Sequence, residues 1–433
     1  MKKWFIFIFE WKHFIRNPFK VLALVLFFAS AIYGINNGVE LFEQQNQKIK
    51  TIKEIASEGA KEINAYYQKG ELGPTDHPWV DVTTPFWAMW YTSTYAYKTP
   101  LPTMIYSIGQ AEQYGFYKKL TFNSSVYDTD MVEEIANPKR LQIGTLDFSF
   151  SILFLSPLLL LILTYHLKAN EAENGVLPLI QLQITSKSAW LISRLLFYLL
   201  LQSAIILALI IYGALQGQIS LWISTPLHEV IFYTLTYQIL WAVIYYIILS
   251  KSITVLASSI SMTGIFLLLT FIVPGIIHQM VSIKFPVNNM LDYIDTERDE
   301  RWALYDESDS LITSQLINLI PEIETSLANQ DSLVSHEVIS RSYSLLINEM
   351  IKERAVEIEL ENERRNEWIN QWNWLNPLTF FQNQLNKAAG THFNNYKVYK
   401  EQIQAGIDTQ NNLMVKDIWN GVLVDAEKYK DYR

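Results

Sequence analysis

Five long apolar runs alternate with polar stretches along the chain. Each run holds about 20 residues or more, enough for an α-helix to cross a hydrocarbon layer about 30 Å thick. Backbone polar groups find no water in such a layer, so the chain has to cross it as a helix. The pattern therefore predicts five membrane-spanning helices, at residues 19–36, 148–167, 189–216, 228–249 and 253–280.

The segment before the first run, residues 1–17, alternates aromatic and basic residues and contains a single acid, Glu10. This composition is typical of an amphipathic helix that lies on the cytoplasmic membrane surface. Pro18 would end that helix before the first span. We expect an interfacial elbow helix, with an irregular basic tail as the alternative. No small-residue cleavage site follows the first run, which favours a retained anchor over a signal peptide.

Basic residues set the expected orientation of the spans. With a cytoplasmic N-terminus, five crossings place residues 37–147, 217–227 and 281–433 outside, and the loops 168–188 and 250–252 inside. The positive-inside rule expects basic residues at the short inner loops. The sequence has them there, at Lys168, Lys187, Arg194 and Lys251.

The outer segments also carry a helical pattern. Leucine and isoleucine recur near helical spacing over residues 39–69, which predicts a stalk that extends the first span. Residues 309–374 hold long stretches without Gly or Pro and predict helices that stand beside this stalk. Residues 79–117, rich in Trp and Tyr, should cap both; an interfacial belt or local core is the main interpretation, and a binding surface the alternative. The fold class is an all-α integral membrane protein with a mostly helical extracytoplasmic module.

Composition narrows the setting further. The formal net charge is −9, which argues against nucleic acid as a partner. The chain has no cysteine, so its outer parts must fold by packing, as suits a bacterial periplasm. The acidic run at residues 292–310 lacks the glycine and spacing of a calcium loop and is expected to be a solvated face.

Catalytic motifs are missing from the sequence. The seven histidines are scattered, and "HEVIF" at His228 lacks the second histidine of a zinc helix. No phosphate-binding loop of the Gly-x4-Gly-Lys-Ser/Thr type and no Gly-x-Ser-x-Gly motif occurs. We therefore expect no enzyme activity, no metal and no cofactor in this chain itself, so that energy has to come from a partner.

The longest inner loop, "KANEAENGVLPLIQLQITSKS", separates two of the most apolar runs. Its Glu171 and Glu173 could offer carboxylates to a cytoplasmic partner, and Gly175 would allow a tight turn where a Cβ would clash. The alternative is that the two acids only keep the loop hydrated.

The region "SPLLLLILTYHLKANEAENGVLPLIQLQITSKSAWLISRLL" resembles the second span, coupling loop and third-span start of type-2 ABC exporter permeases. That pattern is a span, a Glu, an acid or polar residue, a Gly, a short apolar helix, a Ser-containing turn and a basic residue. The matching residues are Glu171, Glu173, Gly175, Ser186 and Arg194.

A second motif, "TPLPTMIYSIGQAEQYGFYKKL", is similar to the outer loop of a bacterial subfamily with large periplasmic loops, often labelled as permease components of multi-copper enzyme maturation. The residues that carry this likeness are Pro100, Pro102, Gly109 and Gln110. Residues 237–259 and 375–403 resemble later segments of the same subfamily.

The resemblance implies a permease subunit in the bacterial inner membrane. Two permeases, identical or sisters, would bind two cytoplasmic ABC ATPases that hold the ATP, with a further partner in the periplasm or outer membrane as an option. Such permeases usually have six spans. Here the sixth is expected to be lost, or the segment "WINQWNWLNPLTFFQNQLN" dips into the interface. Two alternatives stay open: an ATPase-driven complex that transmits force without transport, and a membrane-anchored assembly factor.

Overall fold

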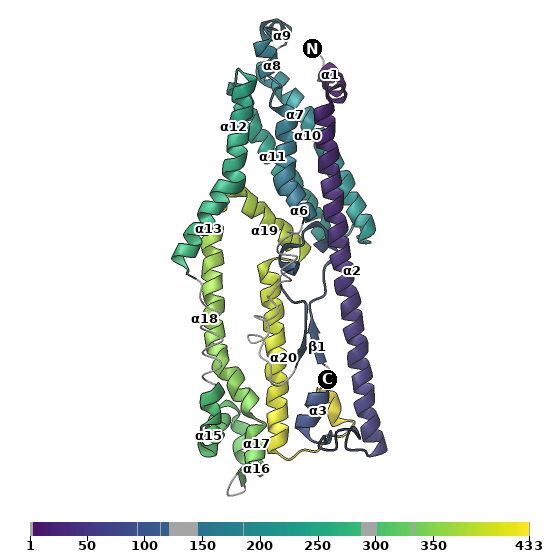
Figure 1. Cartoon of the computed structure of the whole chain (residues 1–433), viewed down its shortest axis with the longest axis vertical. Helices are drawn as coiled ribbons and strands as arrows, with labels where there is room; N and C mark the ends of the chain where they lie inside the picture. Colours follow the sequence, from purple (N-terminus) through teal and green to yellow (C-terminus); the bar gives the residue numbers. More distant parts are fainter. Residues whose placement is uncertain are drawn as a thin grey trace.

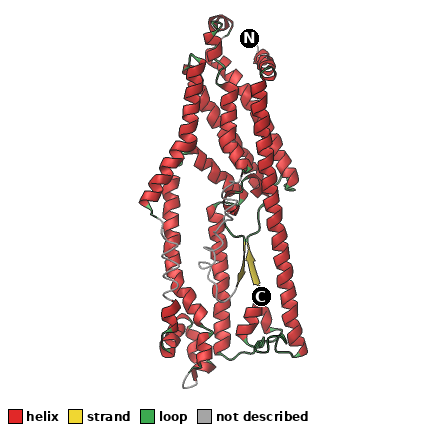
Figure 2. Ribbon diagram, in the orientation of Figure 1, coloured by secondary structure: helices red, strands yellow, loops and turns green. Residues whose placement is uncertain are grey.

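The computed structural model describes residues 3–92, 94–112, 114–120, 146–184, 186–286, 301–330 and 334–432. In this part the chain is predominantly helical and forms an elongated molecule (Figures 1 and 2). We call the end with the N-terminus and helix α9 the loop end, and the opposite end, with helix α3, the distal end. Most of the acidic run, residues 292–300, lies outside the described residues.

The described residues contain five helices that are long and apolar enough to cross a membrane, as the sequence predicts. Two of them are assembled from shorter elements that include a π-helical turn. They are α2 (Pro18–Lys69); α6, η3, α7 and α8 (Phe148–Glu173); α10 (Lys187–Gln216); α11 (Thr225–Lys251); and α12, η4 and α13 (Val255–Lys284).

Pro157 explains the π-helical turn η3 (Ser151–Leu155) in the second of these helices. Proline lacks an N–H and therefore leaves the carbonyl four residues earlier without its helical partner. The Tyr237 hydroxyl of α11 donates to that carbonyl, on Leu153, at 2.8 Å. Gln202 of α10 donates to the Ser156 carbonyl, also at 2.8 Å. These two hydrogen bonds connect α10 and α11 to the helix of Phe148–Glu173 where its backbone is irregular.

Helix α2 continues without a break from the loop end to the distal end (Figure 1). Its 52 residues correspond to about 78 Å at a rise of about 1.5 Å per residue. Asn17 caps its start, and Gly70, with φ of 71°, ends it. A Cβ on Gly34 or Gly38 would collide with the backbone of residues 147–148 or of Ile105, so both glycines permit close packing. The helix that contains residues 19–36 thus continues through residues 39–69, where the sequence predicts a helical extension.

Helix α1 (Lys3–Ile15) precedes α2 and lies at the loop end (Figure 1). The chain leaves α1 through Arg16 and Asn17, and Pro18 opens α2. A helix is present before the first span, and it ends at Ile15, so that Arg16 and Asn17 separate it from Pro18.

Outside the five long helices, the longest helices described are α18 (Tyr343–Gln371) and α20 (Phe393–Trp419). A short antiparallel hairpin of β1 (Thr94–Tyr97) and β2 (Tyr117–Leu120) contacts both α2 and α20, with Thr94 opposite Leu120. This hairpin of two four-residue strands was not predicted, and the rest of the described fold is helical as expected. Helix α18 packs on α20 rather than on α2, so the two predicted stalk segments are separated by other elements.

A shared core at the distal end nevertheless joins them. It collects the far ends of α2, α18 and α20, together with α3 (Pro85–Tyr91), α15 (Asp309–Leu319), η5 (Pro321–Thr325), α16 (Leu327–Gln330), α17 (His336–Ser340) and η6 (Lys428–Tyr432). The expectation that residues 79–117 cap the stalks is only partly right. Helix α3 lies at the distal end, but the chain then returns through β1 to η1 (Pro102–Tyr106) and η2 (Gly109–Glu112), beside the long helices.

Helix α19 (Pro377–Ala389) crosses between α13 and η1 and packs mainly on α11 (Figure 1). Its Leu378, Phe381 and Leu385 belong to the same core as the five long helices. Thirteen residues reach about 20 Å, too short for a crossing. The described residues after Lys284 contain no helix long and apolar enough to span.

Candidate functional site

The loop predicted to contact a partner, residues 168–188, forms two short helices joined by a turn. Helix α8 (Ala169–Glu173) ends at Asn174, and α9 (Leu177–Gln183) follows Val176. Gly175, between them, has φ of 68°. A Cβ at this position would meet nothing within 4 Å. The expected clash is therefore absent, and the left-handed backbone is the reason that glycine suits the turn.

Helix α9 is the most prominent feature of the loop end, where it forms the tip of the molecule (Figure 1). None of its residues is buried. Leu179 is 61% exposed and Leu182 85% exposed, although leucine is usually covered in a folded chain. Leu177 and Ile180, on the other side of α9, pack against the core of the long helices. A helix that exposes leucines on one side in this way offers a surface suited to a protein partner or to lipid.

Below α9, a buried ionic network fixes the base of the loop. Glu171 accepts a hydrogen bond from Arg194 at 3.0 Å, and the same guanidinium donates to the Leu167 carbonyl at 2.6 Å. Arg194 also forms a short ion pair with Glu10 of α1. Glu10 is fully buried and Arg194 is nearly so. A buried carboxylate requires such a partner, because its desolvation is otherwise too costly.

The network continues from Glu10 into α2. The Tyr198 hydroxyl of α10 donates to Glu10 at 2.8 Å and accepts from the Lys20 ammonium at 2.7 Å. Lys20 lies 3.0 Å from a ring nitrogen of His166. Helices α1, α2, α10 and the chain before α8 thus meet in one set of hydrogen bonds.

Glu173 and Lys168 attach the loop to the other side of the bundle. Glu173 accepts a hydrogen bond from the Val255 backbone N–H at 2.8 Å, in the first turn of α12, where the helix dipole favours a carboxylate. Lys168 donates to the Ser250 carbonyl in the last turn of α11 at 2.5 Å. Both predicted carboxylates therefore have partners within the chain, and they hold α8 in place.

Sequence reasoning placed Glu171, Glu173, Gly175 and Arg194 in one site, and the structure brings the three charged ones into contact with the bundle around α8. Sequence reasoning did not identify Glu10 and Tyr198, which complete the network. Glu10 had one visible signal, as the single acid in a basic segment.

The second predicted motif lies elsewhere, where the long helices meet the rest of the molecule. We call this place the junction; it consists of residues 102–112 and 386–391. Gly109 has φ of 50°, and a Cβ there would collide with the side chains of Thr391 and Asn386. The Gln110 N–H donates to the Thr391 carbonyl at 3.2 Å. Pro100 is buried and Pro102 is exposed at the start of η1.

Further hydrogen bonds close the junction. Ser107 donates to the Asn386 side chain at 2.5 Å, and Thr103 donates to the Ala388 carbonyl at 2.8 Å. Beside it, Lys98 donates to the Gly390 carbonyl at 2.7 Å, and burial lowers the pKa of Lys98 to about 8. The motif thus joins the long helices to α19 and α20, and the structure does not bring it near the loop end.

Among the described residues, no group of three or more His, Asp or Glu side chains could hold a metal ion. The arrangement at the loop end offers hydrogen bonds, ion pairs and an apolar surface, which are means of binding and positioning.

A family described as a domain of unknown function (DUF3526) matches residues 340–433. This stretch covers α18, α19, α20 and the C-terminal turn, and so includes one half of the junction. No curated protein and no solved structure matches the chain.

Proposed function

We propose that this chain is the membrane-spanning permease subunit of a type-2 ABC exporter, driven by a separate cytoplasmic ATPase. The observation that carries the proposal is α9, an exposed apolar helix held at the tip of the molecule by a buried ionic network. The five apolar helices support insertion in a membrane, which we take to be the bacterial inner membrane from the sequence resemblance. The sequence likeness of the loop to permease coupling loops supports the assignment of α9 to the ATPase.

In this proposal the roles of the loop residues divide. Leu179 and Leu182 of α9 would contact the ATPase. Glu171, Glu173 and Arg194 would act as positioning residues, because their partners lie within the chain. Gly175 would set the direction of α9 through its left-handed backbone. A second permease, identical or related, would complete the complex, and no catalytic residue is assigned to this chain.

The ionic network gives a physical route for the coupling. A displacement of α8 pulls on Arg194, which is bound to both Glu171 and Glu10. Glu10 is linked through Tyr198 to Lys20 at the start of α2. A movement imposed on the loop is therefore passed to α1, α2 and α10 together, as packed elements move as units.

The test replaces Leu179 and Leu182 with Glu in the same chain. Neither side chain is buried, so the variant should insert and fold, whereas charges in an apolar contact should lower retention of the ATPase by at least about tenfold. Retention is measured as ATP hydrolysis and subunit content of the complex purified from native membranes. Leu423→Glu, at a residue 72% exposed in the distal region, is the matched control.

The proposal fails if no ATP-hydrolysing subunit purifies with the unmodified chain. It also fails if the α9 variant and the Leu423 control retain the ATPase equally.

A second candidate function is force transmission to a partner on the far side of the membrane, without passage of a substrate. The continuous helix α2 favours it, because one rigid rod would link the network at Lys20 to the distal core at Ala60 and Ile63. This candidate requires the same ATPase contact at α9 and differs in what α2 does.

A further inference from the structure

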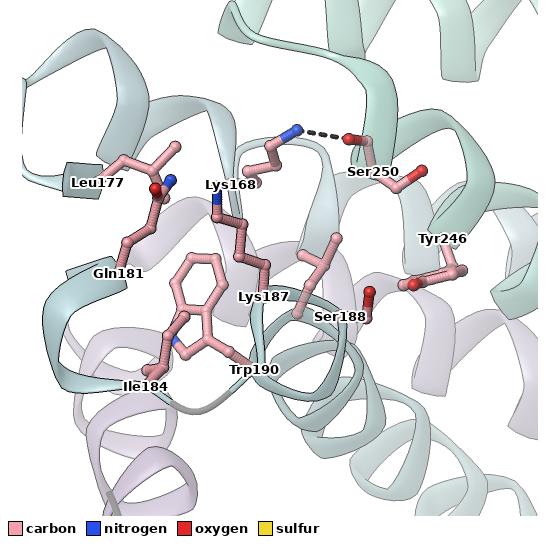
Figure 3. Close-up of a pocket in the computed structure, with 10 residues that line it drawn as sticks. Lys168, Leu177, Gln181, Ile184, Lys187, Ser188, Trp190, Tyr246 and Ser250 are labelled. Carbon is pink, nitrogen blue, oxygen red and sulfur yellow. Dashed lines mark hydrogen bonds between the residues drawn. The ribbon is translucent and has the colours of Figure 1, made fainter.

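A cavity of about 110 Å³ opens at the loop end, between α9, the first turn of α10 and the last turns of α11 (Figure 3). This is room for several water-sized groups. The residues that define its chemistry are Lys168, Gln181, Lys187, Trp190, Tyr246 and Ser250.

The charge in the cavity is positive and uncompensated. Two lysines line it and no acidic residue does. Lys168 uses one of its three donors on the Ser250 carbonyl, which leaves two. Lys187 has no ion-pair partner in the described part of the chain, and it repels Lys168. The two acids of the same loop have other partners, since Glu171 is bound to Arg194 and Glu173 to Val255.

Hydrogen-bond donors and apolar walls surround this charge. Lys187 and Ser188 lie in the first turn of α10, a 30-residue helix whose backbone N–H groups favour an anion. Trp190 and Leu177 form apolar wall, and Tyr246 adds an aromatic ring with a polar tip. Trp and Tyr are the residues that sit at the headgroup level of a bilayer.

We propose that this cavity binds the phosphate group of an acidic phospholipid from the leaflet at the loop end. Two lysines between helix ends at the cytoplasmic surface are suited to anionic headgroups. The apolar wall would receive the glycerol part of the same molecule. The inference relies on the membrane insertion and orientation proposed above, and not on the ATPase contact.

Because of the position of the cavity, a bound lipid would affect how α9 is held. Leu177, Gln181 and Ile184 come from α9 and its end, while Trp190 and Tyr246 come from α10 and α11. A bound headgroup would therefore contact α9 and the long helices at the same time and hold α9 in place. The loop should then be rigid only when acidic lipid is bound.

The test is native mass spectrometry of the full chain in detergent, titrated with phosphatidylglycerol or with zwitterionic phosphatidylcholine. The unmodified chain should retain one phosphatidylglycerol molecule tightly and prefer it over phosphatidylcholine. Lys187→Gln should weaken this binding by about fivefold, and Lys168→Gln with Lys187→Gln by about 25-fold. Lys187→Arg should keep it, and Lys12→Gln, at an exposed residue of α1, is the matched control.

Equal phosphatidylglycerol binding by the double variant and the Lys12 control would overturn the proposal, because the lipid would then coat the helices without a site. Inorganic phosphate supplies the second arm. If phosphate alone binds the lipid-free chain and phosphatidylglycerol does not displace it, the site serves a soluble anion and the lipid assignment is wrong. Loss of the ATPase in the α9 variant, with lipid binding intact, separates this inference from the proposed function.

Discussion

Arg194 forms most of the ion pairs that hold the loop end together. Its guanidinium contacts Glu10 of α1, and Glu171 and the Leu167 carbonyl of the segment around α8, so it joins two distant parts of the chain. Arginine suits this place because its planar fork offers five donors and stays charged when buried. The sequence shows an arginine near the start of an apolar run, but a pairing across 184 positions leaves no local pattern.

Substitution of Arg194 should therefore show how much the network contributes to the stability of the fold. Arg194→Met leaves Glu10 buried without its cation, which costs about 3–5 kcal/mol for a broken buried pair. Glu10→Leu combined with Arg194→Met removes both charges and should recover most of this loss. The measurement is the apparent melting temperature of the purified chain in detergent.

The control for this pair is Lys12→Met, at an exposed residue of the same helix α1 as Glu10. If Arg194→Met melts no lower than the control, the network does not support the fold. If the double variant melts as low as Arg194→Met, charge burial is not the cause.

His392 is a second residue with a measurable consequence, at the start of α20. Its Nδ1 accepts the Asn394 N–H at 3.2 Å, as an N-cap. Burial, with a smaller contribution from Lys387, lowers the pKa of His392 to about 4. The unfolded chain, with a histidine pKa near about 6.5, takes up the proton first as the pH falls. Native stability should thus be complete above pH 6.5 and fall towards pH 4.

At pH 5 this effect is roughly 1–2 kcal/mol, and protonation would also remove the acceptor of the cap. His392→Asn keeps a capping side chain and does not titrate. The melting temperature of the unmodified chain should therefore drop more between pH 7 and pH 5 than that of the variant. Parallel drops in the two proteins would show that His392 is not the titrating group.

At the scale of elements, the five long helices and the stalk could be predicted because hydropathy and helical spacing are local properties. The path of α19 could not. Its apolar face, with Leu378, Phe381 and Leu385, fits a surface helix as well as a helix laid across a bundle. The hairpin β1–β2 was missed for a similar reason, since four-residue strands carry too short an alternation to be recognised.

The same distinction applies to the candidate site. The loop motif located Glu171 and Glu173, but their partners in α1, α10 and α12 depend on how distant helices pack. Sequence spacing therefore identified the segment but not the partners of its carboxylates within the chain. Contact of these carboxylates with an outside partner stays a prediction.

Helix α2 offers the element-scale test of force transmission. Lys50→Gly with Glu54→Gly, at exposed positions of α2, should lower the stability of the helix by about 2 kcal/mol relative to Ala at both positions. The Ala variant should keep the helix intact. Spin labels on cysteines at Glu58 and Ser310 report distances in the distal region, in a chain without native cysteines. Nucleotide added to the ATPase complex should change this distance in the Ala variant and less in the Gly variant. An unchanged distance in both argues against a mechanical role of α2.

At the scale of the whole molecule, the loop end and the distal end are joined by α2 and by the junction. The junction holds α19 and α20 to the long helices through Thr103, Ser107 and Gly109. Asn386 and Thr391, in the stretch that the family of unknown function matches, supply the other side of this contact. The distal core is completed by the C-terminal turn, where the buried Tyr432 donates to Asp417 at 2.5 Å. An input at α9 is thus connected to the far end through packed elements.

The orientation of this molecule in the membrane is the last prediction. Five crossings with an inner N-terminus put the loop end and the distal end on opposite sides, because the polar loops alternate. Single cysteines at Ser310 and Lys430, both exposed, should react with an impermeant thiol reagent added to intact cells. Cysteines at Gln183 and Lys251, exposed at the loop end, should react only after the membrane is opened. Reaction at Ser310 with protection at Lys430 would mean that the chain crosses again after α15, and that the distal core is not formed as described.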